Sequence, residues 1–220
     1  MTKVYYKRVR SAALPALALV FATSSASQQA PATMKTSALD AHEGMTIGVE
    51  PWVSAEKYKP KFPKKSPWDA GVVALHVTFR NDTNDSIRIA ISKIRLTLQM
   101  DEDNRQELRP MTSEDVADAI LKPGGKDPTT KKKLPLPLPG GSTGGRDKKW
   151  DELRIQAEDA GVRNGVIAPH SSTDGLLYFN LRGETNLLKN AQLYIPDLLA
   201  LESNRALLYF DIELGDSATP

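Results

Sequence analysis

The sequence contains no cysteine in its 220 residues. This absence excludes disulfide bonds, thiolate nucleophiles, iron–sulfur clusters and cysteine-rich zinc sites, and it excludes a lipid-modified cysteine behind a signal sequence. Apolar residues make up 40% of the chain and charged residues 25%, which are ordinary values for a globular domain. A chain of this length can bury a core that needs no covalent cross-links.

Histidine is also scarce, with only His42, His76 and His170. The histidines show no metal-binding spacing, and the sequence has neither a GxSxG nucleophile motif nor a phosphate loop ending in GK[ST]. We therefore predict that the protein is not an enzyme and uses no metal or cofactor. One enzymatic alternative stays open, an unrecognised active site near His170 with Ser171 and Asp174 beside it.

The first 26 residues have the composition of a cleaved export signal. A basic start, with Lys3, Lys7, Arg8 and Arg10, precedes an apolar run over residues 11–22 and small residues up to Ala26. That run is shorter than the roughly 20 residues of a membrane-spanning helix. We predict a signal peptide over 1–26, export to the periplasm or the exterior, and no transmembrane anchor after cleavage.

Removal of the signal peptide changes the sign of the net charge. Residues 1–26 hold four basic and no acidic side chains, so the net charge goes from +2 to −2. Nucleic-acid binding needs a basic surface, and an acidic exported chain lacks it. We therefore predict that nucleic acid is not a partner.

Alternation of apolar and polar residues dominates the rest of the chain and is typical of β-strands. Such strands are expected at 45–50, 72–80, 87–91, 94–100, 105–109, 176–181, 193–195 and 207–214. Dense Asn/Asp turn signals separate several of them. This pattern predicts a mainly β, immunoglobulin-like antiparallel β-sandwich of about seven to eight strands over residues 45–216.

The sequence between these strands predicts two short helices and three irregular segments. One helix follows Thr112, a capping residue, and the other runs from about Trp150 to Ala160 before Gly161. Poorly ordered or loop structure is expected in a lead-in at 27–44, in a proline- and lysine-rich loop at 57–67, and in a long flexible insert at 122–147.

Positive charge is concentrated around this insert. Residues 122–149 carry a net +6, which leaves −8 on the rest of the predicted mature chain. One interpretation is a solvated, mobile loop that serves only as a linker. The other is an electrostatic tether to an anionic envelope surface or an acidic partner. The candidate contact residues are Lys131, Lys132, Lys133, Lys148 and Lys149.

Several segments together resemble the immunoglobulin-like accessory domains of bacterial envelope proteins, a family of unknown function. The segments are VALHVTFRNDTNDSIRI, IRLTLQ, RPMTSEDVADAIL and IAPHSSTDGLLYFNL. In those domains a Pro-Gly turn often precedes a strand like Gly175–Phe179, and here Pro169-His170 takes its place. The resemblance covers residues 45–214 and carries over no catalytic residues. It implies a binding or structural module whose partner is an unidentified envelope protein or glycan.

Overall fold

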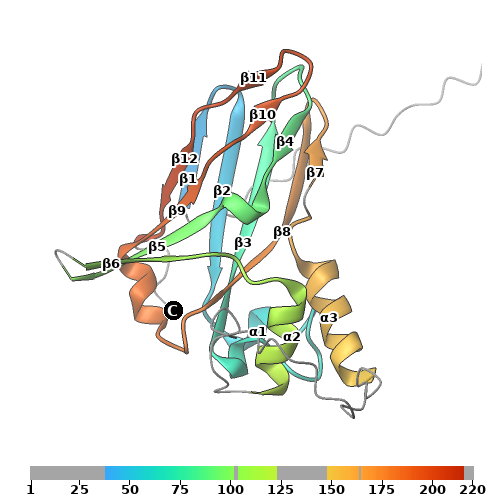
Figure 1. Ribbon diagram of the computed structural model, residues 1–220, viewed down its shortest axis with the longest axis vertical. Coiled ribbons are helices and arrows are strands. Elements are labelled where there is room, and N and C mark those ends of the chain that lie inside the picture. The colour runs from blue at the N-terminus through green and yellow to red at the C-terminus, as the bar shows by residue number, and fades with distance from the viewer. Residues whose placement is uncertain (1–37, 102–103, 123–147, 164, 216–220) are drawn as a thin grey trace, which may run out of the picture. The chain divides into compact units, whose positions relative to one another are not determined.

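The computed structural model describes residues 38–101, 104–122, 148–163 and 165–215 (Figure 1). All of them belong to one compact unit, Met34–Pro220. The predicted signal peptide, the first part of the lead-in and nearly all of the predicted insert, Lys131–Lys133 included, lie outside the described residues.

The first sheet has four antiparallel strands in the order β1-β2-β3-β8. Its strands are β1 (Ala38–His42), β2 (Met45–Trp52), β3 (Val72–Asn81) and β8 (Ser171–Asn180). β3 and β8 pair along their whole length, with Val72 opposite Asn180 and Asn81 opposite Ser171. This pair is the longest ladder among the described strands.

Two further four-stranded antiparallel sheets complete the architecture. One has the order β11 (Arg205–Ala206), β10 (Leu199–Ala200), β4 (Ile87–Ile89), β7 (Gly165–Ile167). The other has the order β12 (Phe210–Glu213), β9 (Ala191–Ile195), β5 (Arg95–Asp101), β6 (Asn104–Leu108). Three chain segments pass directly from one of these sheets to the other, as β4–β5, β9–β10 and β11–β12. The described residues form twelve strands where seven to eight were predicted, because β1, β7, β10 and β11 were not predicted; β10 and β11 belong to the segments that pass between sheets.

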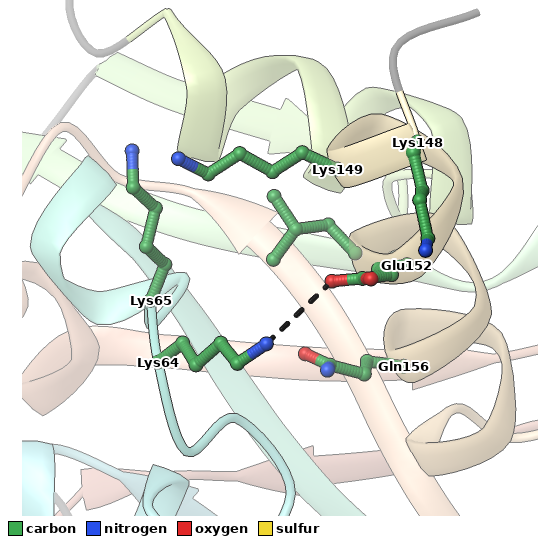
Figure 2. Close-up of a pocket in the computed structure, with 7 residues that line it drawn as sticks. Lys64, Lys65, Lys148, Lys149, Glu152 and Gln156 are labelled. Atoms are coloured by element: carbon green, nitrogen blue, oxygen red, sulfur yellow. Dashed lines mark ion pairs between the residues drawn. The ribbon is translucent and has the colours of Figure 1, made fainter.

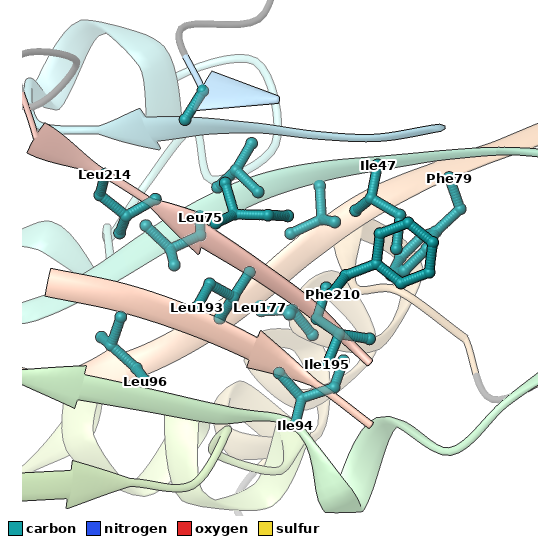
Figure 3. Close-up of a cluster of buried hydrophobic side chains, with 14 of the residues drawn as sticks. Ile47, Leu75, Phe79, Ile94, Leu96, Leu177, Leu193, Ile195, Phe210 and Leu214 are labelled. Atoms are coloured by element: carbon teal, nitrogen blue, oxygen red, sulfur yellow. The ribbon is translucent and has the colours of Figure 1, made fainter. Parts of the chain in front are cut away.

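The main hydrophobic core draws residues from all three sheets, and Figure 3 labels members from the first and third. Ile47, Leu75 and Leu177 of the first sheet belong to the same buried cluster as Leu193 and Phe210 of the third. They occupy alternate positions along their strands, as period-two patterning requires. The mainly β, antiparallel sandwich is therefore confirmed, while its immunoglobulin-like subtype stays a prediction.

A second buried cluster lies on the opposite face of β3 and β8, under three helices that we call the helical cap (Figure 1). The cap consists of α1 (Ala55–Tyr58), α2 (Ser113–Leu121) and α3 (Lys148–Ala160). Both predicted helices are confirmed as α2 and α3. Thr112 caps α2 in a reciprocal capping box with Asp115, which satisfies two backbone donors at the helix start.

The predicted loop at 57–67 is wrong in part, because its first residues form the end of α1 and bury two aromatic side chains. Tyr58 and Phe62 are 0% and 2% exposed. The Tyr58 hydroxyl accepts a hydrogen bond from Ala74 N at 2.8 Å and donates one to Trp52 O at 2.9 Å. It thereby joins the ends of β2 and β3. Proline and lysine content alone gave no sign of this tertiary contact.

The predicted lead-in at 27–44 is also wrong over its last residues, because 38–42 form β1. A two-residue hairpin turn joins β1 to β2, and its residues Glu43 and Gly44 have φ angles of 50° and 78°, as tight hairpin turns require. The Glu43 carboxylate accepts hydrogen bonds from Arg205 and from Leu208 N. These contacts, the Leu208 amide first, hold the pKa of Glu43 below its usual value.

The predicted continuous strand at 207–214 is interrupted. Leu207 is 6% exposed and packs in the main core, whereas Leu208, which shares the alternate positions of Phe210, Ile212 and Leu214 in the predicted strand, is 64% exposed. Regular strand pairing resumes at Phe210. The irregular backbone between β11 and β12 shifts the alternation by one residue, a change that sequence periodicity cannot show.

Candidate functional site

Helix α3 supplies one wall of the candidate site. Its residues Leu153, Ala157 and Ala160 recur at helical spacing and are buried in the cap. Trp150 Nε1 donates a hydrogen bond to Asp118 Oδ1 of α2 at 2.9 Å, which fixes the first turn of α3 against its neighbour. Because this face is held, the backbone of α3 is fixed against the cap and its adjoining face points outward.

The segment around Lys64 and Lys65 supplies the other wall. On one side of it, Phe62 packs its ring edge-on against Tyr178, with ring centroids 6.3 Å apart. On the other side, the buried Pro67 leads into a short helical turn that begins at Trp68. Two anchors therefore hold four intervening residues over the cap, and the lysines between them face α3.

The two walls enclose a pocket of about 440 Å³ (Figure 2). Its lining residues are Lys64, Lys65, Lys148, Lys149, Glu152, Leu153 and Gln156. Four lysines thus face a single carboxylate, which gives the lining a formal excess of positive charge. Leu153, 4% exposed, adds an apolar surface.

The ion pair between Lys64 and Glu152 in the pocket lining is loose. Lys64 Nζ lies 3.8 Å from Glu152 Oε2, and the two side chains are 80% and 46% exposed. Such exposed pairs contribute little to stability, because solvent screens them and both side chains lose rotamer freedom. Glu152 therefore neutralises little of the cluster, and Lys64 stays available to a ligand.

The electrostatics of the pocket favour an anion. Lys148 and Lys149 occupy the first turn of α3, where the helix dipole is positive and basic side chains are normally disfavoured. Lys65 is half-buried and has no ion-pair partner among the described residues. A bound anion would relieve the repulsion between these ammonium groups and also complement the helix dipole.

One buried polar atom of the pocket lining has no partner in the described part of the chain. Gln156 Oε1 is shielded from solvent and accepts no hydrogen bond there. An unpaired buried acceptor is unfavourable by about 1–3 kcal/mol. Gln156 lies one helical turn after Glu152, so two oxygen acceptors sit side by side on α3, across from the lysines of the other wall.

The candidate contact residues proposed from the sequence fall into two groups, those that line the pocket and those outside the described residues. Lys148 and Lys149 line the pocket, whereas Lys131, Lys132 and Lys133 lie outside the described residues. Sequence reasoning missed Lys64 and Lys65. The KPKFPKK segment is visibly basic, but Lys65 precedes Lys148 by 83 positions, and no local pattern indicates that the two meet.

The alternative active site near His170 is not assembled. His170 Nε2 lies 2.9 Å from Asn84 Oδ1, and Ser171 Oγ donates to Ala168 O at 2.7 Å. Asp174 instead pairs with His76, at 2.9 Å. His170 has a φ of 52°, the left-handed conformation that glycine takes in a Pro-Gly turn, so it has a structural role at this turn.

The pair formed by His76 and Asp174 lies on the outer face of the first sheet. The Trp52 ring stacks near His76, with centroids 6.0 Å apart and planes 26° apart. No serine or threonine hydroxyl among the described residues hydrogen-bonds to His76. Nor do the described residues bring together three or more side chains suited to hold a metal ion.

Comparisons of this chain with protein-family models, with curated proteins and with solved structures found no match. The assignment to the immunoglobulin-like envelope family therefore stays a prediction from sequence. Among the helices of the described ranges, none is both long and apolar enough to cross a membrane.

Proposed function

We propose that this protein is an exported, non-enzymatic binding module of the bacterial cell envelope that holds an anionic partner in the lysine-lined pocket. One observation carries the proposal, the convergence of Lys64 and Lys65 with Lys148 and Lys149 around one cavity. Lysines repel one another, so their gathering in a pocket with one carboxylate has a physical rationale when a ligand supplies negative charge.

The charge distribution along the chain supports an anionic partner. The predicted mature chain carries −2 overall, so the pocket is a local positive region on an acidic protein. Such a region attracts an anion without making the whole surface bind polyanions. The β3–β8 ladder under the cap supplies a rigid base for the α3 wall of the site.

The tether interpretation and the pocket proposal share Lys148 and Lys149 but differ in the rest of the binding surface. A tether would use Lys131–Lys133, whereas the pocket uses Lys64 and Lys65. The observed contacts favour the pocket, because they join its two walls in one cavity. The enzymatic alternative at His170 receives no support from the contacts of His170, Ser171 and Asp174.

The test compares co-sedimentation of the purified protein with vesicles of phosphatidylcholine, with and without phosphatidylglycerol. We expect binding only to the anionic vesicles and weaker binding at high salt. The double variant Lys65→Gln/Lys148→Gln should bind about 30-fold more weakly, since each lysine near an anionic surface contributes about 1 kcal/mol. Lys189→Gln, which removes one positive charge at a site away from the pocket, is the charge control.

Deletion of residues 126–146 separates the two interpretations. If the pocket holds the anion, the deletion variant binds as the parent protein does, and the double lysine variant does not. Loss of binding on deletion, with normal binding by the double variant, would refute the pocket and support the tether.

Export is tested separately by the intact mass of the protein recovered from envelope and culture fractions. We expect a chain that begins at Ser27, shortened by residues 1–26. A full-length chain confined to the cytoplasm would contradict the export part of the proposal and leave the pocket unaffected.

A further inference from the structure

We propose that the ligand of this pocket is a polyol phosphate, in which lysines bind the phosphate while Glu152 and Gln156 accept hydrogen bonds from hydroxyl groups. This inference rests on the proposed function, because it names the class of anion that the pocket holds. It comes from the complete set of lining residues and not from the lysines alone.

The volume of the pocket indicates a ligand larger than an inorganic anion. A cavity of about 440 Å³ lies in the range of sites that hold small organic molecules. Since one water molecule occupies about 30 Å³ in the liquid, phosphate alone would leave most of this space to solvent. The remaining space lies beside Leu153, whose apolar side chain can pack against the carbon atoms of a ligand.

The two oxygen acceptors on α3 indicate that the ligand also donates hydrogen bonds. Gln156 Oε1 is buried and accepts none from the described residues, and the carboxylate of Glu152 is exposed and pairs loosely with Lys64. Sulfate and a dianionic phosphate ester group have no proton to donate, so by themselves they would leave Gln156 unpaired. A hydroxyl group supplies the missing donor, and carboxylate and amide oxygens both accept from hydroxyls.

The lysines and the two acceptors are arranged so that one molecule can reach both. In Figure 2 the ammonium group of Lys64 points toward Glu152, with Gln156 beside it, whereas the ammonium groups of Lys65 and Lys149 lie next to each other in the view, on the side of the pocket away from Gln156. A phosphate ester with adjacent hydroxyls matches this set. Two sources share this chemistry, the glycerol headgroup of a phospholipid and a soluble glycerol phosphate unit.

The test for a soluble ligand measures the dissociation constants of glycerol 1-phosphate, methyl phosphate and glycerol by calorimetry with the full chain. We expect glycerol 1-phosphate to bind about tenfold more tightly than methyl phosphate, the effect of one to two further net hydrogen bonds. Glycerol alone, which lacks the charge, should not bind measurably.

The variants separate the two halves of the site. Gln156→Met keeps the length of the side chain and removes its oxygen, so it should bring the two phosphate esters to nearly equal affinity and leave methyl phosphate unchanged. Lys65→Gln should weaken both esters alike. Thermal unfolding of each variant shows that it is folded, and Lys189→Gln again serves as the charge control.

Binding to vesicles distinguishes a phospholipid headgroup from a soluble polyol phosphate as the ligand. Phosphatidylglycerol and phosphatidylmethanol carry the same charge, but only the first has free headgroup hydroxyls. A preference for phosphatidylglycerol that Gln156→Met abolishes assigns the site to a lipid headgroup, whereas a preference seen only with the soluble esters assigns it to a free polyol phosphate.

Two results would overturn the inference. Equal affinity for glycerol 1-phosphate and methyl phosphate, together with equal binding to phosphatidylglycerol and phosphatidylmethanol vesicles, would refute it. The proposed anion-binding function would be unaffected by that result. A preference that persists in Gln156→Met would remove Gln156 from the explanation. Absence of binding to every phosphate probe would refute the proposed function as well.

Discussion

Strands β3 and β8 present two faces that meet different surroundings. On the sandwich face, Leu75, Phe79, Leu177 and Phe179 are all buried in the main core. On the opposite face, Val72, Ala74, Leu176 and Tyr178 lie under the helical cap, and the same face then becomes polar and more exposed at His76, Thr78 and Asp174.

The two faces are stabilised in different ways. In the described part of the main core, packing is almost entirely apolar and therefore without strong directional preference. The cap, by contrast, contains hydroxyl and indole groups with specific partners, such as Tyr58 with Ala74 and Trp150 with Asp118. We infer that the sandwich supplies most of the stability, whereas polar contacts in the cap fix the position of α3 and hence of the pocket.

The largest expected effect is on the sandwich face. Phe179→Ala removes a fully buried ring from the main core and should lower the free energy of unfolding by about 3–5 kcal/mol. Leu208→Ala, a truncation at a 64% exposed site, should change it by less than about 0.5 kcal/mol. Chemical denaturation of both variants checks the contrast, and similar losses would contradict the described core.

The next effect is a loss of stability at alkaline pH that originates in the cap. Burial raises the pKa of Tyr58 and Tyr178 above the usual 10.0, and for Tyr178 the nearby Tyr58 adds to the shift. Above pH 10 the unfolded chain releases these two protons while the folded chain keeps them. The free energy of unfolding should therefore fall with rising pH, by up to about 2.7 kcal/mol per unit.

Denaturation curves from pH 8 to pH 12 measure this slope. Tyr58→Phe should roughly halve the fall of the free energy of unfolding per pH unit above pH 10. Tyr209→Phe, at a 57% exposed site, should leave that fall unchanged. An identical slope in both variants would show that the cap tyrosines are not protected from solvent.

At neutral pH, Tyr58→Phe has a smaller effect. The change leaves the ring in place but removes the partner of Ala74 N and of Trp52 O. A buried amide without a partner should lower the free energy of unfolding by about 1–3 kcal/mol. Hydrogen exchange at Ala74 should accelerate in the variant. Unchanged exchange there would contradict the bridging role of the hydroxyl group.

The smallest effect is expected at the start of α2. Thr112→Ala removes the hydroxyl that accepts from Asp115 N at 3.2 Å and should destabilise the protein by about 1 kcal/mol. Thr112→Ser keeps the hydroxyl group and should restore most of the loss. Equal stability of the alanine and serine variants would show that the capping box contributes nothing.

The sequence predicted what depends on local pattern. Alternation located β2, β3 and β5, and the Thr112 signal located α2, because periodicity and capping are encoded within one element. It did not predict α1, whose four residues are held by the burial of Tyr58 against distant strands. Nor did it show where strands bend from one sheet to the next, since that depends on packing against the first sheet.

The candidate site was predicted only in half for the same reason. Lys148 and Lys149 stand out in a basic stretch, so composition alone drew attention to them. Lys64 and Lys65 reach the same pocket because Phe62 packs against Tyr178 of β8, a contact between residues far apart in the chain. The acceptor role of Gln156 depends on burial, which a single polar residue in a helix does not indicate.

The most direct test of the central claim is a chemical-shift map of the ¹⁵N-labelled protein during titration with glycerol 1-phosphate. We expect the shifting amides to cluster at 64–65 and 148–156, and we expect Lys65→Gln/Lys148→Gln to abolish those shifts. Shifts confined to other surfaces, such as the outer face around His76, or shifts that survive in the double variant, would contradict the central claim.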